Sequence, residues 1–196
     1  MIPRLKTGAF ILVSLALAFI FRAALGHPMW VMTRGMVPSL FDGDLVWVSS
    51  TTPVLGDVVK VQFDSEPGVY RVVGMEGQQI EIADGVLLVD GQPVQEDGSK
   101  TEAAPGVDCT VREVPTSKSQ INARTFWVVP GGQQAATRVP RGHVYVLGDH
   151  RGVAGDSRPW GAIRTEQIKG VVGRILWSWD NCETTPRWQR IGKSIE

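Results

Sequence analysis

Two hydroxyl side chains and one lysine near the start of the chain could support nucleophilic hydrolysis. Thr33 and Ser39 stand on either side of a short stretch that contains glycine and proline, and Lys60 falls in the alternating run Val58 to Phe63. A hydroxyl attacks a carbonyl when a neighbouring base accepts its proton, and a lysine serves as that base when burial lowers its pKa. This chemistry requires Lys60 to point inward, whereas a lysine in an alternating strand usually faces water.

A second polar group lies in the stretch from Gly148 to Gly161, where Asp156 and Arg158 stand two residues apart. Taken alone, such a pair is a solvated ion pair of little energetic weight. Within a reactive site, the same pair orients its neighbours through charge-assisted hydrogen bonds.

Cysteine and histidine residues are few. Cys109 and Cys182 are the only cysteines, and they either close a disulfide across a long loop or remain two buried thiols. His27, His143 and His150 are scattered without the spacing of metal ligands, so we expect no metal and no cofactor.

The amino-terminal segment is strongly apolar. Arg4 and Lys6 precede the apolar run from Thr7 to Phe21, and beyond Arg22 the apolar residues resume as Ala23 to Leu25. At about 1.5 Å per residue, this stretch nearly spans a hydrocarbon core of roughly 30 Å. It is either a retained single-pass anchor in the cytoplasmic membrane or a cleaved secretory signal peptide. Because basic residues favour a cytoplasmic amino terminus, both readings place the rest of the chain on the extracytoplasmic side.

The body of the chain alternates short β-prone runs with glycine and proline. Asp84-Gly85 and Asp90-Gly91 predict two tight hairpin turns in succession. Such a pattern predicts a mainly β, antiparallel domain with little helix. The expected strands are Leu45 to Val48, Val58 to Phe63, Val69 to Val73, Gln79 to Ile82, Val86 to Val89, Phe126 to Val129, His143 to Leu147 and Gly170 to Trp177.

We expect one folded domain, because 196 residues suffice for a single core of ordinary size. Residues 1–28 form the cytoplasmic start and the transmembrane anchor, and residues 29–196 form the β-rich domain. The polar interval 92–125 is expected to be a cap-like, solvent-facing excursion. Twenty basic residues balance twenty acidic ones, so no global positive charge attracts nucleic acid.

Three stretches, in order, carry a resemblance to a known family: Arg34 to Asp44, Tyr70 to Gly74 and Gly148 to Gly161. Together they resemble the bacterial type I signal peptidases. That family has an amino-terminal membrane anchor and a β-rich catalytic domain with a serine and lysine dyad. The last stretch is the most specific, because its glycine, aspartate, arginine, serine and tryptophan residues all fall at the family's spacing.

The resemblance places substitutions at both dyad positions. Gly35 stands where the family's serine attacks the scissile carbonyl, and Tyr70 stands where its lysine accepts the proton. Glycine has no side chain to acylate, and a phenol with a pKa of about 10 is protonated at neutral pH. Outside this context, Gly35 would be read as a turn glycine and Tyr70 as a half-buried strand aromatic.

Other family positions are kept. Thr33 matches the hydroxyl that joins a backbone N–H in stabilising the oxyanion, and Met36 and Pro38 match the turn that places the nucleophile.

In the last stretch, Asp156 and Arg158 match the supporting acidic and basic pair. Ala154 stands where active members carry a serine that orients the lysine.

These residues predict a membrane-anchored homologue that has lost cleavage and binds a peptide as an added strand. Its partners would be membrane lipid and a secreted precursor or surface-fibre subunit. One alternative is an active peptidase with a relocated dyad, in which Ser39 or Thr33 attacks and Lys60 is the base. A second alternative is a scaffold subunit beside an active peptidase.

Overall fold

The computed structural model of the chain describes residues 13–14, 26–63, 67–105, 111–121 and 124–195. Within these ranges, no helix has the length and apolar character to cross a membrane. Most of the anchor expected in residues 1–28 lies outside the described residues. The body is mainly antiparallel β structure, as the sequence predicted.

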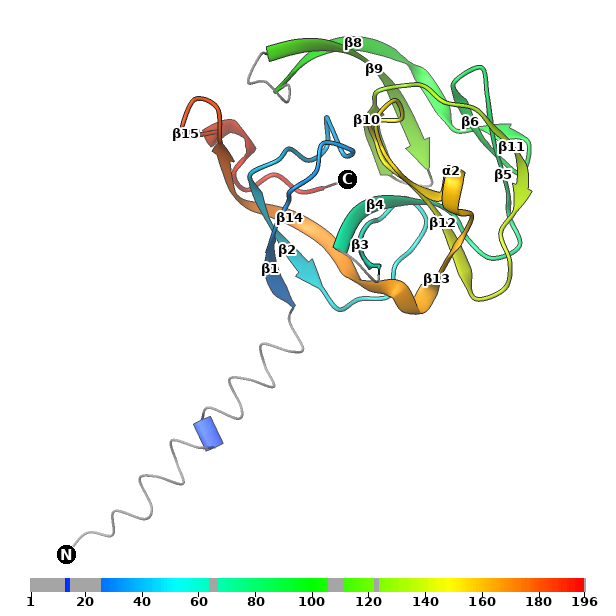
Figure 1. Cartoon of the computed structure of the whole chain (residues 1–196), viewed down its shortest axis with the longest axis horizontal. Coiled ribbons are helices and arrows are strands. Elements are labelled where there is room, and N and C mark those ends of the chain that lie inside the picture. The colour runs from blue at the N-terminus through cyan, green and yellow to red at the C-terminus, as the bar shows by residue number, and fades with distance from the viewer. Residues whose placement is uncertain (1–12, 15–25, 64–66, 106–110, 122–123, 196) are drawn as a thin grey trace, which may run out of the picture.

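The largest sheet forms the centre of the body (Figure 1). Its strand order is β1-β2-β14-β3-β4-β12-β13, and β15 pairs with β14 at one end. Each pairing within it is antiparallel. Its strands are β1 (His27–Trp30), β2 (Asp44–Ser49), β3 (Val58–Gln62), β4 (Pro67–Gly74), β12 (His143–Leu147), β13 (Ile163–Arg164), β14 (Ile168–Asp180) and β15 (Thr185–Pro186).

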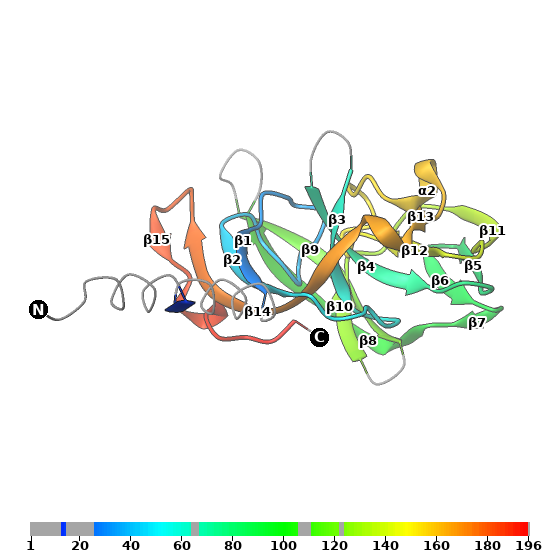
Figure 2. The same cartoon turned by 90° about the horizontal axis from the view of Figure 1, so that it is seen from below.

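Two smaller sheets extend this body. One has the order β11-β5-β6-β7 and lies at the end of the molecule opposite β1 and β15 (Figures 1 and 2). The other has the order β10-β9-β8. Their strands are β5 (Gln79–Ala83), β6 (Val86–Val89), β7 (Gln92–Pro93), β8 (Gln95–Pro105), β9 (Val111–Ile121), β10 (Arg124–Val128) and β11 (Gln134–Arg138).

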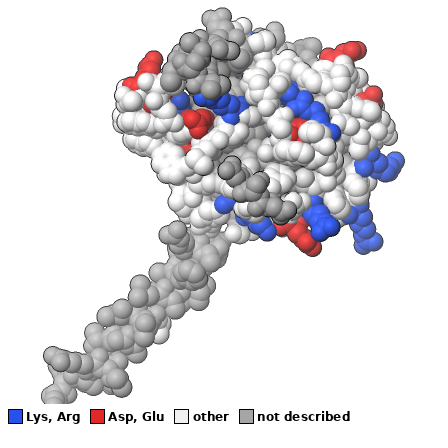
Figure 3. Space-filling view, in the orientation of Figure 1, with Lys and Arg blue, Asp and Glu red and all other residues white. Residues whose placement is uncertain are grey.

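Besides residues 13–14, which are helical, the described elements include three short helical pieces: α2 (Ser157–Trp160), η1 (Thr165–Gln167) and η2 (Trp188–Arg190). Every strand expected from the sequence is present, with ends that differ by a few residues at most. On the face drawn in Figure 3, acidic and basic side chains are interspersed over a largely uncharged surface.

The two Asp-Gly pairs form the predicted hairpin turns. Asp84 and Gly85 have φ angles of 50° and 78°, and Asp90 and Gly91 have φ angles of 51° and 78°. Positive φ at both central residues matches the right-handed twist of the flanking strands. The first turn pairs β5 with β6, and the second pairs β6 with β7.

The excursion expected over residues 92–125 is more regular than its composition indicated. Strands β8 and β9 form a long antiparallel hairpin, and β10 continues from β9 as a third strand. Its strands are rich in polar residues, so they lack the apolar alternation by which a half-buried strand is recognised. Cys182 is disulfide-bonded, and Cys109, the other cysteine of the sequence, lies outside the described residues.

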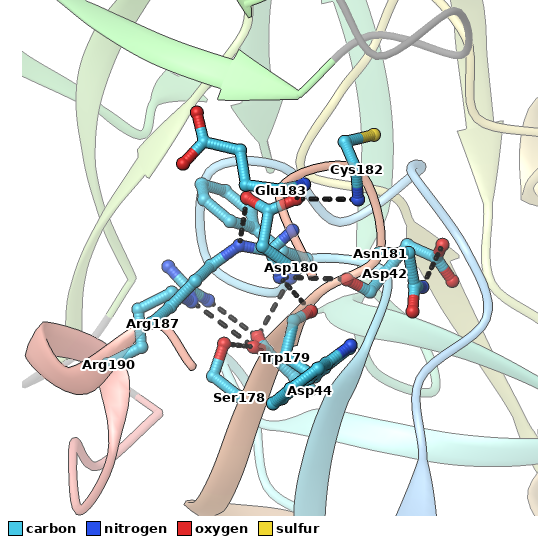
Figure 4. A network of polar contacts seen from close by, with 11 residues as sticks. Asp42, Asp44, Ser178, Trp179, Asp180, Asn181, Cys182, Glu183, Arg187 and Arg190 are labelled. Carbon is cyan, nitrogen blue, oxygen red and sulfur yellow. Dashed lines mark hydrogen bonds and ion pairs between the residues drawn. The ribbon is translucent and has the colours of Figure 1, made fainter. Parts of the chain in front are cut away.

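The carboxy-terminal segment folds back on β2 and β14 through a polar network (Figure 4). Arg190 forms an ion pair of 2.7 Å with buried Asp44, which also accepts a 2.5 Å hydrogen bond from the Ser178 hydroxyl. The same Arg190 Nη2 atom also donates to the backbone carbonyl of Ser39 at 2.9 Å. The segment therefore braces the turn around residues 35–39.

A fully buried ion pair joins the central sheet to the stretch that follows β12. The Arg71 guanidinium on β4 binds both carboxylate oxygens of Asp149, at 2.9 and 2.8 Å, and both side chains have no exposed surface. Arg71 also donates to the carbonyl of Gly56 and lies 3.8 Å over the ring of Phe126. The Ser39 hydroxyl completes the group by donating to Asp149 at 2.5 Å.

Replacing Arg71 by methionine should destabilise the fold strongly, because Asp149 would remain buried without its guanidinium partner. We expect the free energy of unfolding in urea to fall by about 3–5 kcal/mol. The double variant Arg71→Met with Asp149→Leu should recover most of that loss. A double variant as unstable as the single one would contradict this account.

Arg141→Met is the matched control for that measurement. Arg141 is 94% exposed and lies 3.8 Å from Glu76, so its removal should leave the urea midpoint unchanged.

Candidate active site

The turn that contains Gly35 is held from both sides by hydrogen bonds. The Gly35 N–H donates to the Thr33 hydroxyl oxygen at 3.1 Å, and the Gly35 carbonyl accepts from the N–H of His150 at 2.9 Å. Within the turn, Leu40 donates to the carbonyl of Met36 at 2.9 Å. The sequence-predicted oxyanion residue Thr33 thus lies directly against the predicted nucleophile position.

Met36 and Pro38 fix this turn to the core. The Met36 side chain is fully buried and packs in a cluster with Leu40, Val46 and Ile195. Pro38 is buried beside it. The turn expected from the sequence is therefore formed, and its position depends on core packing from several strands.

Little space separates Gly35 from Ala154. A Cβ atom on Gly35 would lie 3.3 Å from the Ala154 Cβ and 3.4 Å from the Thr33 hydroxyl oxygen. These separations are tight but need shifts of only a few tenths of an ångström. On Gly148, by contrast, a Cβ would come within 2.5 Å of the Gly35 carbonyl oxygen. Gly148 is therefore required for the close approach of the two segments, whereas Gly35 is not.

Tyr70 packs in a cluster of three aromatic rings. Its ring lies edge-on to Phe63 and to Trp160, with centroid separations of 6.0 and 5.8 Å, and Phe63 and Trp160 are 5.0 Å apart. Burial, and secondarily the negative charge of Asp156, raises the pKa of the Tyr70 phenol above its usual value of 10. The hydroxyl at this position is therefore protonated at neutral pH.

Two adjoining cavities meet at Thr33 and Tyr70. The smaller, of about 260 Å³, is also lined by Gly35, Val153 and Ala154. The larger, of about 670 Å³, has a wall made by the aromatic cluster. We call these two cavities together the groove.

Asp156 and Arg158 lie beside the groove as an ion pair with two contacts. The Arg158 Nε and Nη2 atoms bind the two oxygens of Asp156 at 2.7 and 2.9 Å. The Asp156 carboxylate also accepts the N–H of Gly148 at 3.1 Å and caps helix α2. The sequence-predicted pair therefore fixes the glycine that contacts Gly35.

The relocated dyad residues have other partners. The Ser39 hydroxyl is bound to Asp149 and accepts from Arg71 at 3.2 Å. The Lys60 amine on β3 lies 3.2 Å from His27 Nε2. Among the hydrogen bonds of the described residues, none joins Lys60 to Ser39 or to Thr33.

Sequence reasoning missed the Arg71–Asp149 pair, although a signal for it was present. Arg71 lies between Val69 and Val73 in an otherwise apolar strand, and a period of two turns all three toward the same face. A charged residue on a buried face requires a buried partner. No group of three or more His, Cys, Asp or Glu residues in the described ranges could hold a metal ion.

The chain matches the family model described as signal peptidase, peptidase S26, over residues 4–177. It is 29% identical to the probable signal peptidase I-1 of Synechocystis sp., covering 93% of this chain and 84% of that protein. It is 25% identical to signal peptidase I T of Bacillus subtilis, covering 92% and 89%, and 28% identical to signal peptidase IB of Staphylococcus aureus, covering 85% and 87%. The solved signal peptidase I of Enterococcus faecalis matches 63% of this chain and 98% of its own, at 23% identity and a TM-score of 0.40.

Both tyrosines should titrate at unusually high pH. Burial, with Asp156 as the second cause, raises the pKa of Tyr145 to about 12 and shifts that of Tyr70 in the same direction. Because the unfolded pKa is about 10, their contribution to stability is complete below pH 10 and is lost as the pH rises toward 12. Phenolate absorbance of the native protein, followed against pH, measures this directly.

Tyr70→Phe is the control for the titration. It should leave one phenol, with a pKa near 12. If both phenols of the unmodified, folded protein titrated near pH 10, the two rings would not be buried as described.

Proposed function

The chain belongs to the signal peptidase family, peptidase S26, and from that premise we propose that it is a noncatalytic member that binds peptides. The client would be a secreted precursor or a surface-fibre subunit. Residues 1–28 would anchor the protein in the cytoplasmic membrane, and residues 29–196 would form its extracytoplasmic domain. One observation carries the proposal. Gly35, Tyr70 and Ala154 line the same cavity, and none of them supplies the hydroxyl or the amine that the family's reaction uses.

Each of the three positions lacks a group that the family's reaction needs. Gly35 offers no hydroxyl, Tyr70 offers a protonated phenol in place of an amine, and Ala154 offers a methyl group beside Gly35. A base that stays protonated accepts no proton from a nucleophile. Three changes around one point support a common loss of the reaction.

The groove itself supports retained binding. Its smaller cavity opens beside Gly35, and the wall of its larger cavity carries exposed apolar surface from Met32 (86% exposed) and Trp160 (48% exposed). A peptide that adds as a strand binds through main-chain hydrogen bonds and pockets for alternate side chains. Neither interaction uses the serine or the lysine.

The relatives are named as signal peptidases, which favours the alternative of an active peptidase. In this chain that activity would need Ser39 or Thr33 to meet Lys60. The Ser39 hydroxyl is committed to a buried carboxylate, and Lys60 contacts His27. A scaffold subunit beside an active peptidase would use the same anchor and domain. It differs from the proposed function in that its groove would bind no peptide.

We expect no cleavage when the purified chain is incubated at stoichiometric amounts with a preprotein that has a small-x-small cleavage site. Intact mass spectrometry of both chains over hours measures the outcome. A specific cut that disappears in Ser39→Ala, Thr33→Ala or Lys60→Ala would establish the relocated dyad. Lys169→Ala, an exposed lysine on β14, is the matched control for Lys60→Ala.

Restoring the dyad should restore activity. Gly35→Ser with Tyr70→Lys is expected to give measurable cleavage, because the serine Cβ fits beside Ala154 with only small shifts. Adding Ala154→Ser should raise the rate by orienting the lysine. Gly35→Ala with Tyr70→Lys is the control that has the same Cβ without the hydroxyl. If the double variant folds but does not cleave, residues other than the two dyad positions also prevent the reaction.

Peptide binding should depend on the mouth of the smaller cavity. Val153 is 62% exposed and lines that cavity, so Val153→Arg should weaken binding of a signal-peptide fragment by about tenfold, or about 1.4 kcal/mol. Calorimetric titration measures the Kd. Val54→Arg, at an exposed valine outside the groove lining, should leave it unchanged. No binding by the unmodified chain would favour the scaffold role.

A further inference from the structure

Three side chains that can donate hydrogen bonds line the smaller cavity of the groove. They are Thr33, Arg34 and Tyr70, and the cavity, of about 260 Å³, has far more space than one water molecule needs. Thr33 and Arg34 are consecutive residues between β1 and β2, and Tyr70 lies on β4. One guanidinium and two hydroxyl groups from separate segments therefore belong to the same cavity.

The guanidinium of Arg34 is accessible to a ligand. The side chain is partly exposed, and no hydrogen bond or ion pair joins it to another described residue. None of its nitrogen atoms is among the buried polar atoms that lack a partner, so the head group keeps accessible surface. A guanidinium of this kind binds a carboxylate through two parallel N–H···O hydrogen bonds.

The two hydroxyl groups can donate to the same ligand. The Thr33 oxygen accepts the N–H of Gly35 at 3.1 Å, and its own O–H hydrogen remains to donate. The Tyr70 hydroxyl makes no hydrogen bond to a described residue. Because burial, and secondarily the charge of Asp156, raises the pKa of Tyr70, its hydroxyl keeps the proton that it would donate.

Gly35 allows the main chain of a ligand to come close to these donors. It lines the same cavity and has no Cβ atom, and its neighbours in the lining include Ala154 and Gly155. A backbone can approach a glycine more closely than any other residue. This lining therefore favours a main-chain group of a peptide, next to a small side chain, over the end of a long side chain.

We propose that the smaller cavity binds the free carboxyl terminus of a client peptide whose last residue is small. Arg34 would hold both carboxylate oxygens, and Thr33 and Tyr70 would donate to the lone pairs that remain. Capture of a peptide's carboxyl terminus is a recurrent mode of peptide recognition. The inference rests on the proposed function, because it names the part of the client that the groove would hold.

The proposal gives Tyr70 and Arg34 a role in binding. A phenol at position 70 is a poor base, but it is a good donor to a carboxylate. Arg34 supplies the positive charge that attracts the carboxylate. The same cavity that lacks a nucleophile and a base thus contains the groups that recognise a carboxylate.

Calorimetric titration of the full chain with one peptide in two forms tests the site. The peptide ends in a small-x-small sequence, with either a free carboxylate or a carboxamide. We expect the carboxamide to bind about tenfold more weakly, because it loses the charge-assisted hydrogen bonds to Arg34. Arg34→Gln should remove most of that difference. Arg141→Met, at an exposed arginine outside the groove lining, should keep it.

Tyr70→Phe tests the phenol separately. The phenylalanine ring can keep the contacts with Phe63 and Trp160, so the variant removes the hydroxyl alone. We expect it to weaken binding of the free carboxylate form about fivefold. The urea midpoint of each variant shows that it is folded.

The outcomes separate this inference from the proposed function. Equal Kd values for the carboxylate and carboxamide forms would overturn the inference and leave peptide binding in place. If neither form binds, the proposed function fails and this inference fails with it. A carboxamide peptide with a terminal aspartate that binds as tightly as the free carboxylate form would assign the site to a side-chain carboxylate, contrary to the proposal.

Discussion

The buried ion pair between Arg71 and Asp149 is the constraint on which the rest of this structure depends. It joins the strand that carries Tyr70 to the segment that contacts Gly35, and it includes the hydroxyl of Ser39. Because both side chains have no exposed surface, neither can be lost without leaving a charge in the core. The folding of the domain therefore maintains the geometry of the groove, whether or not the groove supports a reaction.

Gly35 and Tyr70, the two positions that the sequence matched to a dyad, lie outside this constraint. Gly35 contacts its neighbours mainly through its backbone, and Tyr70 fills its surroundings by packing on Phe63 and Trp160. Asp156, Arg158 and Gly148, by contrast, fix the close approach of two segments. Asp156, Arg158 and Gly148 are therefore needed by the fold itself, independently of any reaction.

Much of the fold could be predicted from local patterns. Alternating apolar residues identified eight strands, and two Asp-Gly pairs identified the hairpin turns, because both signals act over a few residues. The β8–β9 hairpin was not predicted, since its polar strands lack that alternation. Positions of Gly35, Tyr70 and Thr33 followed from ordered motifs, but the Arg71–Asp149 contact joins residues 78 apart, and spacing along the chain does not encode such a distance.

The aromatic packing of Tyr70 limits which single substitutions this position tolerates. A lysine that replaced Tyr70 alone would place an amine between Phe63 and Trp160 and would remove two ring contacts. No serine would stand at position 35 to donate a proton to that amine. A serine that replaced Gly35 alone would need only small shifts at Ala154 but would have no base beside it. Under the proposed function, each single substitution gains no catalysis, so only the two substitutions together could restore a dyad. The packing of the three rings thus opposes replacement of Tyr70 by a single substitution.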